Sequence, residues 1–173
     1  GGAAENDQEL QDSLLNECGK LDGLVHNASI LGTQMPIEQY DIKLWYSTIQ
    51  INLNAPFMLT QFLIPALLKS DDARIIFLSS TVGRKARAYW GAYSVSKFGI
   101  EGFAKTLSEE LEKTQISVNT VNPGKLRTEM RRTAYPAEDS STVPLPEEKS
   151  QAIVHLLSSS SPKINGEQLT LSD

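Results

Sequence analysis

A tyrosine and a lysine, Tyr93 and Lys97, lie four residues apart in the run Tyr-Ser-Val-Ser-Lys, and Ser80 precedes the tyrosine by thirteen positions. Free tyrosine has a pKa near ~10 and free lysine near ~10.4. On a helix, residues i and i+4 share a face, so the Lys97 ammonium would lie beside the Tyr93 hydroxyl. A neighbouring positive charge favours the phenolate, and we therefore expect Lys97 to lower the pKa of Tyr93. The spacing predicts a tyrosine that works as a general acid or base.

These residues need a scaffold, and the apolar runs predict strands that alternate with helices. Buried strands are predicted at residues 21–25, 74–78, 116–121 and 168–171. Helices are predicted at residues 5–18, 38–68, 91–113 and 146–157. Pro56 and Pro65 should bend or break the second helix. Residues 125–146 are polar, basic and then proline-rich, which predicts a long functional loop or lid. The alternation predicts an α/β fold, a doubly wound parallel sheet in a single domain.

Polar residues or tight turns follow three of the predicted strands. They are Asn27-Ala28-Ser29, then Ser79-Ser80, then Asn122-Pro123-Gly124. The carboxyl ends of parallel strands meet at one edge of a sheet, and ligands of such folds bind beyond that edge. We therefore expect these three segments and Tyr93 to surround one site. The spacing to Tyr93 favours Ser80 over Ser79, which we expect to face the other side of the strand end.

Composition excludes several other classes of function. The net charge of −5 argues against a nucleic-acid surface, which would need a basic face. The two histidines and the single Cys18 form no metal-ligand spacing, so no metal site is expected. The lone cysteine cannot form an internal disulfide, which fits a reducing compartment. No signal peptide or membrane-spanning run is found, so a cytoplasmic location is expected by default.

Four motifs, in the same order along the chain, resemble the short-chain dehydrogenase/reductase family. The first is His26-Asn27-Ala28-Ser29, which looks like the family's Asn-Asn-Ala-Gly turn. The second is Ile51-Asn52-Leu53-Asn54, and the third is Ser80 with Tyr-x-x-x-Lys. The fourth is Val121-Asn122-Pro123-Gly124 followed by Thr128. Further likeness at residues 82–84, 90–93 and 127–131 suggests a bacterial YciK-like subgroup.

The resemblance implies a Rossmann-like fold and an NAD(P)(H)-dependent oxidoreductase that moves a hydride between nicotinamide and a carbonyl or alcohol substrate. It implies a catalytic set of Asn52, Ser80, Tyr93 and Lys97, in which Ser80 binds the substrate oxygen and Tyr93 donates the proton. Lys97 would lower the Tyr93 pKa and bind the nicotinamide ribose, while Asn52 would hold a water that connects Lys97 to solvent. The implied cofactor-binding residues are Asn27, Ala28, Ser29, Tyr93, Lys97, Pro123, Gly124 and Thr128. The family also implies a homodimer or homotetramer.

The chain departs from the family pattern in two places. Members open with a strand, a glycine-rich turn and two more strands, and Gly1-Gly2 does not match that motif. Residues 1–173 are thus expected to be the carboxyl-terminal two-thirds of one domain that lacks its first three strands. The residue that selects NAD or NADP lies in the segment without a match, so the choice stays open. Ser29 also stands where the family usually has glycine.

The sequence leaves several alternatives open for the function of the chain and for the roles of individual residues. The chain could be a non-catalytic binding module or an inactive fragment, or the site could run an isomerisation, epimerisation or dehydration. Two basic groups, at residues 84–87 and 127–132, are either solvated or contact an anionic substrate or a neighbouring subunit. Trp90 belongs either to the core or to the wall of the substrate pocket. His26 is expected to pack beside the cofactor turn.

Overall fold

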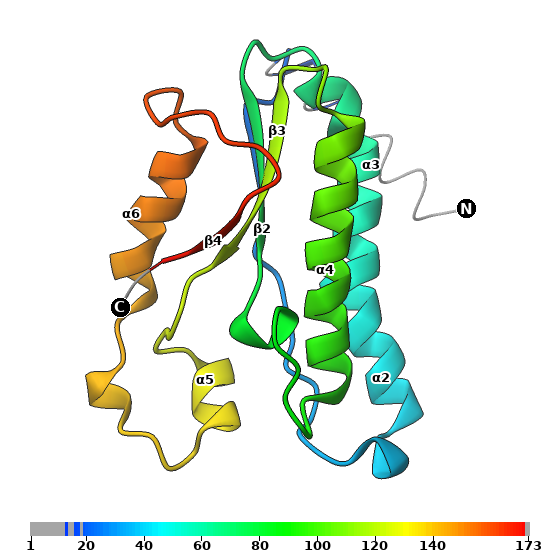
Figure 1. Ribbon diagram of the computed structural model, residues 1–173, viewed down its shortest axis with the longest axis vertical. Helices are drawn as coiled ribbons and strands as arrows, with labels where there is room; N and C mark the ends of the chain where they lie inside the picture. Colours follow the sequence, from blue (N-terminus) through cyan, green and yellow to red (C-terminus); the bar gives the residue numbers. More distant parts are fainter. Residues whose placement is uncertain (1–12, 14–15, 18, 172–173) are drawn as a thin grey trace.

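A parallel sheet forms the centre of the molecule (Figure 1). The computed structural model describes residues 13, 16–17 and 19–171. Within these residues, four strands pair in the order β1-β2-β3-β4, all parallel. Their bounds are Gly23–His26, Ala73–Leu78, Ile116–Asn122 and Gln168–Thr170. Every residue of β3 is buried, as a strand covered on both faces requires.

Helices cover both faces of the sheet, which confirms the doubly wound fold (Figure 1). On one face lie α2 (Ile42–Ile49), α3 (Ala55–Leu67) and α4 (Gly91–Glu110). The other face carries α6 (Pro146–Leu157), which begins and ends where the sequence predicted. The helix predicted at residues 5–18 lies mostly outside the described residues.

The core lies between the sheet and α3 and α4. Its largest fully buried side chains are Phe77, Leu67, Ile75, Ile100 and Val118. These side chains come from β2, β3 and the inward faces of the two helices, so burial of their apolar surface fixes both helices on the sheet. A second buried cluster, Leu31, Val82, Trp90 and Tyr93, lies apart from this core.

The long helix predicted at residues 38–68 is divided in the structure. A 3₁₀ turn at Ile37–Gln39 precedes α2, and a π-helix at Gln50–Asn54 separates α2 from α3. The change of helix type thus comes before Pro56, which lies in the first turn of α3, where a missing N–H is tolerated. Pro65 lies inside α3, which continues to Leu67, so of the two expected effects, a bend or a break, the break does not occur there.

The segment predicted as a lid contains regular structure. It includes α5 (Glu129–Ala134) and a 3₁₀ turn at Ser140–Thr142. The Thr128 side chain accepts a hydrogen bond from the Arg131 N–H and caps the helix. Glu129 in the first turn and Arg131 and Arg132 in the last complement the helix dipole. These capping signals are local, and the overall polarity of residues 125–146 masks them.

A partly buried ion pair connects four elements beside the sheet. The Arg84 Nε, just after the 3₁₀ turn η3 (Thr81–Gly83), donates to Glu101 Oε1 on α4 at 2.7 Å. Arg84 also donates to the Leu169 carbonyl of β4 at 3.0 Å, and Glu101 accepts from the Thr120 hydroxyl of β3 at 2.6 Å. Glu101 is only 6% exposed. The pair therefore holds the turn after β2 against α4.

Gly83 lets this turn approach α4 closely. A Cβ on Gly83 would lie 2.7 Å from the Lys97 Cβ and 3.0 Å from the Lys97 backbone. Such a contact is too short for carbon atoms, so a side chain here would push η3 away from α4. Gly102, on the same helix, has no neighbouring atom within 4 Å of its Cβ position.

We predict that Gly83→Ala lowers the free energy of unfolding by about 1–3 kcal/mol, the usual cost of overpacking. Gly102→Ala is the matched control and should stabilise the protein by up to ~1 kcal/mol, because alanine favours the helix. Urea unfolding of both variants would measure this difference. Equal stabilisation by both substitutions would contradict the close approach at Gly83.

Candidate active site

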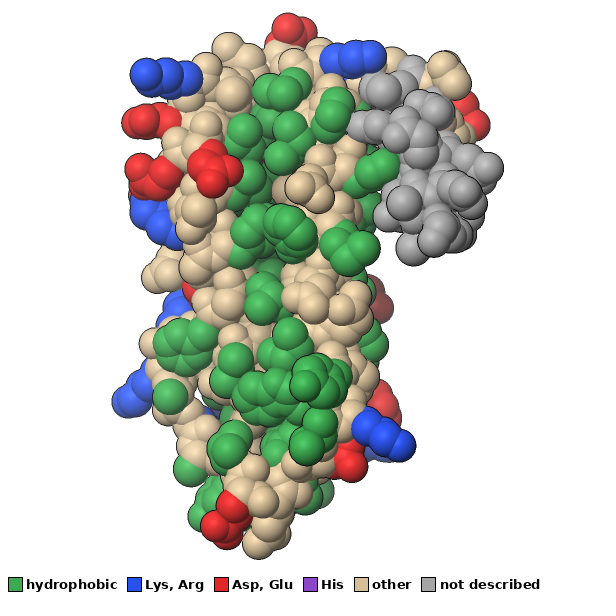
Figure 2. Space-filling model, turned by 90° about the vertical axis from the view of Figure 1, so that its right-hand side faces the viewer, with side chains coloured by type: hydrophobic (Ala, Val, Ile, Leu, Met, Phe, Trp, Pro, Cys, Tyr) green, Lys and Arg blue, Asp and Glu red, His purple; other side chains and the backbone are tan. Residues whose placement is uncertain are grey.

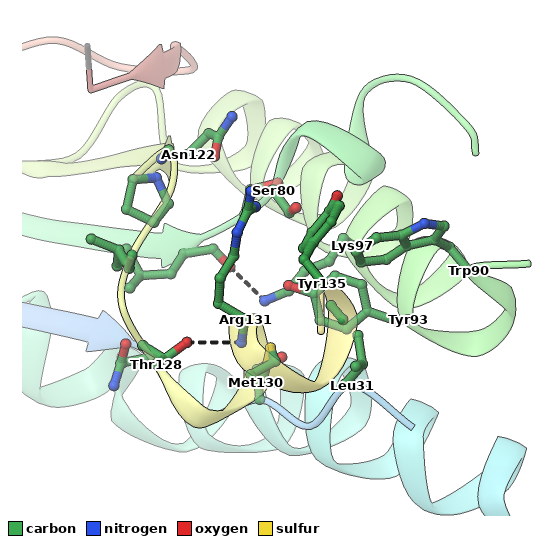
Figure 3. Close-up of a pocket in the computed structure, with 18 residues that line it drawn as sticks. Leu31, Ser80, Trp90, Tyr93, Lys97, Asn122, Thr128, Met130, Arg131 and Tyr135 are labelled. Atoms are coloured by element: carbon green, nitrogen blue, oxygen red, sulfur yellow. Dashed lines mark hydrogen bonds between the residues drawn. The ribbon is translucent and has the colours of Figure 1, made fainter. Parts of the chain in front are cut away.

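A pocket of about 300 Å³ opens at the carboxyl edge of the sheet (Figure 3). Three strand ends, the first two turns of α4, and α5 contribute to its wall. Its polar or turn-forming lining residues are Asn27, Ser29, Ser79, Ser80, Tyr93, Lys97, Asn122, Pro123, Gly124 and Thr128. The structure thus brings together most of the residues singled out in the sequence. Ala28 and Asn52 are not part of this wall.

Tyr93 is 8% exposed and packs with Trp90 in the second buried cluster. Burial raises the pKa of its hydroxyl, and Tyr135 acts in the same direction, while a hydrogen bond with Ser80 opposes the shift. The expectation that Lys97 lowers this pKa is wrong for the protein in this state. Removal from water disfavours the phenolate more strongly than the neighbouring groups favour it.

Lys97 is buried beneath the tyrosine. Its Nζ donates to the Leu78 carbonyl, the last residue of β2, at 2.8 Å, and lies 5.6 Å from the centroid of the Tyr93 ring. Burial lowers the pKa of Lys97 to about 8, against the opposing charge of Glu101. Burial thus brings this lysine closer to neutrality at physiological pH, whereas an exposed lysine titrates near ~10.4.

Asn52 connects the turn after β1 to α4. Its Oδ1 accepts from the Ile30 N–H at 2.8 Å, and its Nδ2 donates to the Ile30 carbonyl at 2.8 Å and the Ser96 hydroxyl at 3.1 Å. Asn52 is 1% exposed, within the π-helix. Both amide N–H bonds are therefore engaged, and only the remaining lone pair of Oδ1 could meet the expected water. Short π-helical turns occur frequently at functional sites.

The turn segments leave polar groups available to a ligand. Asn27 and Ala28 are exposed, and the buried Ser29 hydroxyl has no hydrogen-bond partner among the described residues. Gly124 adopts a positive φ of 77°, and its N–H donates to Asn122 Oδ1 at 3.1 Å. An open pocket edged by an unpartnered hydroxyl and a glycine turn fits the nicotinamide and ribose of a dinucleotide.

Aromatic residues that the sequence only partly indicated complete the wall. Trp90 is 7% exposed and lines the pocket, so it is both a core residue and a wall residue. The Tyr135 ring is tilted by 46° against Trp90 with the centroids 5.8 Å apart, and the Arg131 guanidinium lies 3.9 Å from the Tyr135 ring centroid. In Figure 3 the Arg131 side chain extends from α5 into the pocket, toward Ser80. A motif search overlooks Tyr135, because nothing in its sequence neighbourhood is distinctive.

His26 packs beside the turn at residues 27–29, as expected. It stacks on Phe77 with ring centroids 4.6 Å apart, and its Nε2 shares a hydrogen bond of 2.7 Å with the Thr60 hydroxyl. Burial lowers its pKa to about 4, so the ring is neutral at physiological pH.

Ser79, the alternative to Ser80, also lines the pocket, and its hydroxyl has no hydrogen-bond partner among the described residues.

Known proteins share this arrangement of sequence and structure. The model of the short chain dehydrogenase family matches residues 3–139. The chain belongs to the short-chain dehydrogenase family. This confirms the resemblance drawn from the four motifs, and with it the Rossmann-like fold.

Individual family members are similar over most of this chain. The uncharacterised oxidoreductase YciK of Escherichia coli K12 is 44% identical over 143 residues, which are 83% of this chain and 56% of YciK. The chain therefore spans little more than half the length of that relative. A putative short-chain dehydrogenase from Pseudomonas syringae superposes with a TM-score of 0.92 at 46% identity, over 96% of this chain and 68% of that one. A Shigella flexneri 2a member in complex with NADP gives a TM-score of 0.91 at 40% identity, with coverages of 96% and 69%.

Two other kinds of site are absent from the part of the chain that the structure describes. No group of three or more histidine, cysteine or acidic residues there could hold a metal ion. None of the helices in this part combines the length and the apolar character that crossing a membrane requires.

We predict that Lys97 titrates with a midpoint near pH 8 in the folded protein, below the ~10.4 of a lysine in an unfolded chain. The unfolded chain would then bind more protons than the folded one between these values, so Lys97 makes the free energy of unfolding rise with pH there. Carbon-13 NMR of the lysine Cε signals, with the Lys97 signal assigned by its absence in Lys97→Met, measures this midpoint. A Lys97 midpoint near ~10.4 would contradict the effect of burial.

We also predict that Asn52→Ala lowers the free energy of unfolding by about 1–3 kcal/mol, because it removes the partner of the half-buried Ile30 N–H and carbonyl. It also removes one hydrogen bond from the buried Ser96 hydroxyl, which keeps its bond to the Tyr93 carbonyl. Asn54→Ala is the control, since Asn54 is exposed and its side chain bonds to Gln50 in the preceding turn. It should change stability by less than ~0.5 kcal/mol. Thermal or urea unfolding compares the two, and similar losses would argue against the bridging role.

Proposed function

We propose that the protein is an NAD(P)(H)-dependent oxidoreductase that interconverts a carbonyl compound and the corresponding alcohol. The observation that carries the proposal is the convergence of Ser80, Tyr93 and Lys97 on one pocket, beside the turn at residues 122–124. These three side chains come from a strand end and from two successive turns of α4. Membership of a family of oxidoreductases supports the same reaction class.

The pocket wall supplies groups suited to a nicotinamide dinucleotide. Asn27, Ala28 and Ser29 would contact its ribose from the end of β1, and Pro123, Gly124 and Thr128 would lie against the nicotinamide. The cofactor supplies or accepts the hydride when bound. The relatives whose structures contain NADP and NADPH support the proposal, and NADP is the form we would test first.

Ser80 and Tyr93 act on the substrate oxygen in this proposal. The Ser80 hydroxyl would donate a hydrogen bond to the carbonyl oxygen and orient it. Tyr93 would donate the proton in the reductive direction, and its phenol is protonated at neutral pH, since burial raises its pKa. Lys97, with a pKa of about 8, would stabilise the negative charge left on the tyrosine oxygen and bind the cofactor's ribose. Asn52 would position the turn after β1 and contribute to a water link between Lys97 and solvent.

We further propose that residues 1–173 correspond to the carboxyl-terminal two-thirds of one dehydrogenase domain, and that the protein forms a homodimer or homotetramer. Figure 2 shows hydrophobic side chains gathered along the middle of the face over α3 and α4, with charged side chains toward its margins. Exposed apolar residues on these helices include Phe57, Met58, Val95 and Phe98. A continuous apolar face of this kind favours contact with a second copy.

We predict that Tyr93→Phe, in the full-length protein, reduces turnover of a carbonyl substrate with NADPH by about 10²–10⁴-fold, the usual contribution of a general acid. Loss of absorbance by the reduced nicotinamide measures the rate. Cofactor affinity, measured by fluorescence titration, should change little, because the substitution removes only one oxygen atom.

Tyr89→Phe is the matched control, because Tyr89 is 61% exposed and does not line the pocket. It should retain the rate of the unmodified protein. Turnover by Tyr93→Phe at the control's rate would refute the proposal. Conversion of a substrate without any change in nicotinamide absorbance would favour an isomerase or dehydratase instead.

A further inference from the structure

A second cleft adjoins the pocket that contains Tyr93. Its volume is about 620 Å³, and it lies between the loop that follows η3, the turn after β3, α5 and the end of β4. The two cavities share part of their walls. The shared residues are Ser80, Trp90, Asn122, Gly124, Arg131 and Tyr135. A molecule whose carbonyl group reaches Ser80 can therefore extend into the second cleft.

The wall of this cleft is basic. Lys85, Arg87, Lys125 and Arg131 line it, and no aspartate or glutamate does. The cleft wall is therefore positively charged, although the whole chain carries a net charge of −5. Charges of one sign around a cleft reinforce one another and raise the local concentration of oppositely charged ligands.

Arg87 is held in place by aromatic neighbours. Its guanidinium lies 5.8 Å from the centroid of Trp90 and 5.5 Å from that of Tyr135, and its Nη1 donates to the Tyr135 hydroxyl at 2.7 Å. A guanidinium carries five N–H donors, and a single hydrogen bond leaves several for a ligand. A stacked arginine of this kind is well prepared to bind a planar carboxylate or a phosphate.

The same wall already binds one carboxylate. Arg131, whose guanidinium lies 3.9 Å from the Tyr135 ring centroid, donates from Nε and Nη2 to the two oxygens of Glu138, both at 2.7 Å. Lys125 also contributes its charge to Glu138 and lowers the pKa of that carboxyl group. In the described part of the chain, no ion pair includes Lys85, Arg87 or Lys125. Arg131 thus binds an anion at this wall, while Lys85 and Arg87 form no ion pair with the residues that the structure describes.

We propose that this cleft binds an oxyanion group of the substrate, a carboxylate or a phosphate, while the substrate's carbonyl oxygen meets Ser80 and Tyr93. Arg87 is the main anchor, and Lys85 and Lys125 add charge. The substrate class is then a carbonyl compound that bears an anionic group at some distance from the reacting carbon. This inference rests on the proposed oxidoreductase function, which defines the position of the carbonyl group.

A matched series of ligands tests the proposal in the full-length protein with NADPH bound. The probes are the oxo acids 4-oxopentanoate, 5-oxohexanoate and 6-oxoheptanoate, each paired with its methyl ester, which lacks the charge. Saturation-transfer NMR measures their dissociation constants without requiring turnover. We expect at least one acid to bind about tenfold more tightly than its ester, the effect of one charge-assisted contact. This preference should decrease as ionic strength rises.

Paired variants assign the preference to the cleft. Lys85→Gln with Arg87→Gln should bring acid and ester within about twofold of each other, since this removes two of the cations. Lys69→Gln with Lys113→Gln makes the same change of charge at exposed positions before β2 and β3, at the opposite end of the sheet, and should keep the preference. Lys85→Glu tests the cleft without altering the stacked Arg87, and it should weaken binding of the acid alone.

Equal binding of acids and esters by the unmodified protein, at every chain length, would overturn the proposal. So would an acid preference that survives both the double variant and Lys85→Glu. Tyr93→Phe separates this inference from the proposed function, because it should abolish turnover and keep the acid preference. Retention of turnover in Tyr93→Phe would refute the catalytic role of Tyr93. It would not change the comparison of acids with esters, which measures binding alone.

Discussion

The ion pair of Arg84 and Glu101 holds the turn after β2 against α4, one helical turn beyond Lys97. The Glu101 side chain is 6% exposed and the Arg84 side chain 20%, so removal of the arginine would leave a buried carboxylate without its compensating charge. The same glutamate opposes the effect of burial on the pKa of Lys97. One interaction therefore sets the distance between two elements and the charge balance of the site that they form. Gly83 permits that distance, because it has no side chain between the turn and the helix.

Burial dominates the chemistry of the two titrating groups in the site. It moves the pKa of Tyr93 upward and that of Lys97 downward, since in each case the charged form loses hydration. The two shifts bring the groups toward a neutral phenol beside an ammonium that releases its proton more easily. In this state the phenol holds its proton more firmly than a free tyrosine, and the ammonium holds its proton less firmly than a free lysine. Ligands that fill the pocket would exclude more water and change this balance further.

Local patterns predicted much of the fold because they reflect constraints that neighbouring residues satisfy alone. The strand at Ala73–Leu78 and the start of α4 at Gly91 follow from an apolar run and from helical periodicity. The π-helix around Asn52 depends on partners 22 and 44 residues away, Ile30 and Ser96, and no periodicity signals it. Spacing also predicts the wrong direction for the shift of the Tyr93 pKa. Spacing indicates the charge of a neighbour, but not how much water the fold removes from the tyrosine hydroxyl.

The candidate site likewise contains one part that the sequence predicts and one part that it does not. Ser80, Tyr93 and Lys97 meet in one pocket because parallel strands bring their carboxyl ends to one edge, a property of the fold class itself. The basic cleft depends instead on how the segment after β3 folds back over the loop after β2. Arg87 and Tyr135 lie 48 residues apart and meet only through that return of the chain. Tertiary packing of this kind leaves no local signal in either segment.

The shortness of α5 has a consequence for how the pocket opens. A helix of six residues cannot hold itself together in water, because forming its first turn costs more free energy than its few hydrogen bonds return. Its order therefore comes from the Thr128 cap and from the stacking of Arg131, Tyr135 and Arg87. The sheet and α4 do not depend on these contacts. The segment can consequently unfold and refold as a separate unit of low local stability, and it can admit or release a ligand while the rest of the domain stays folded.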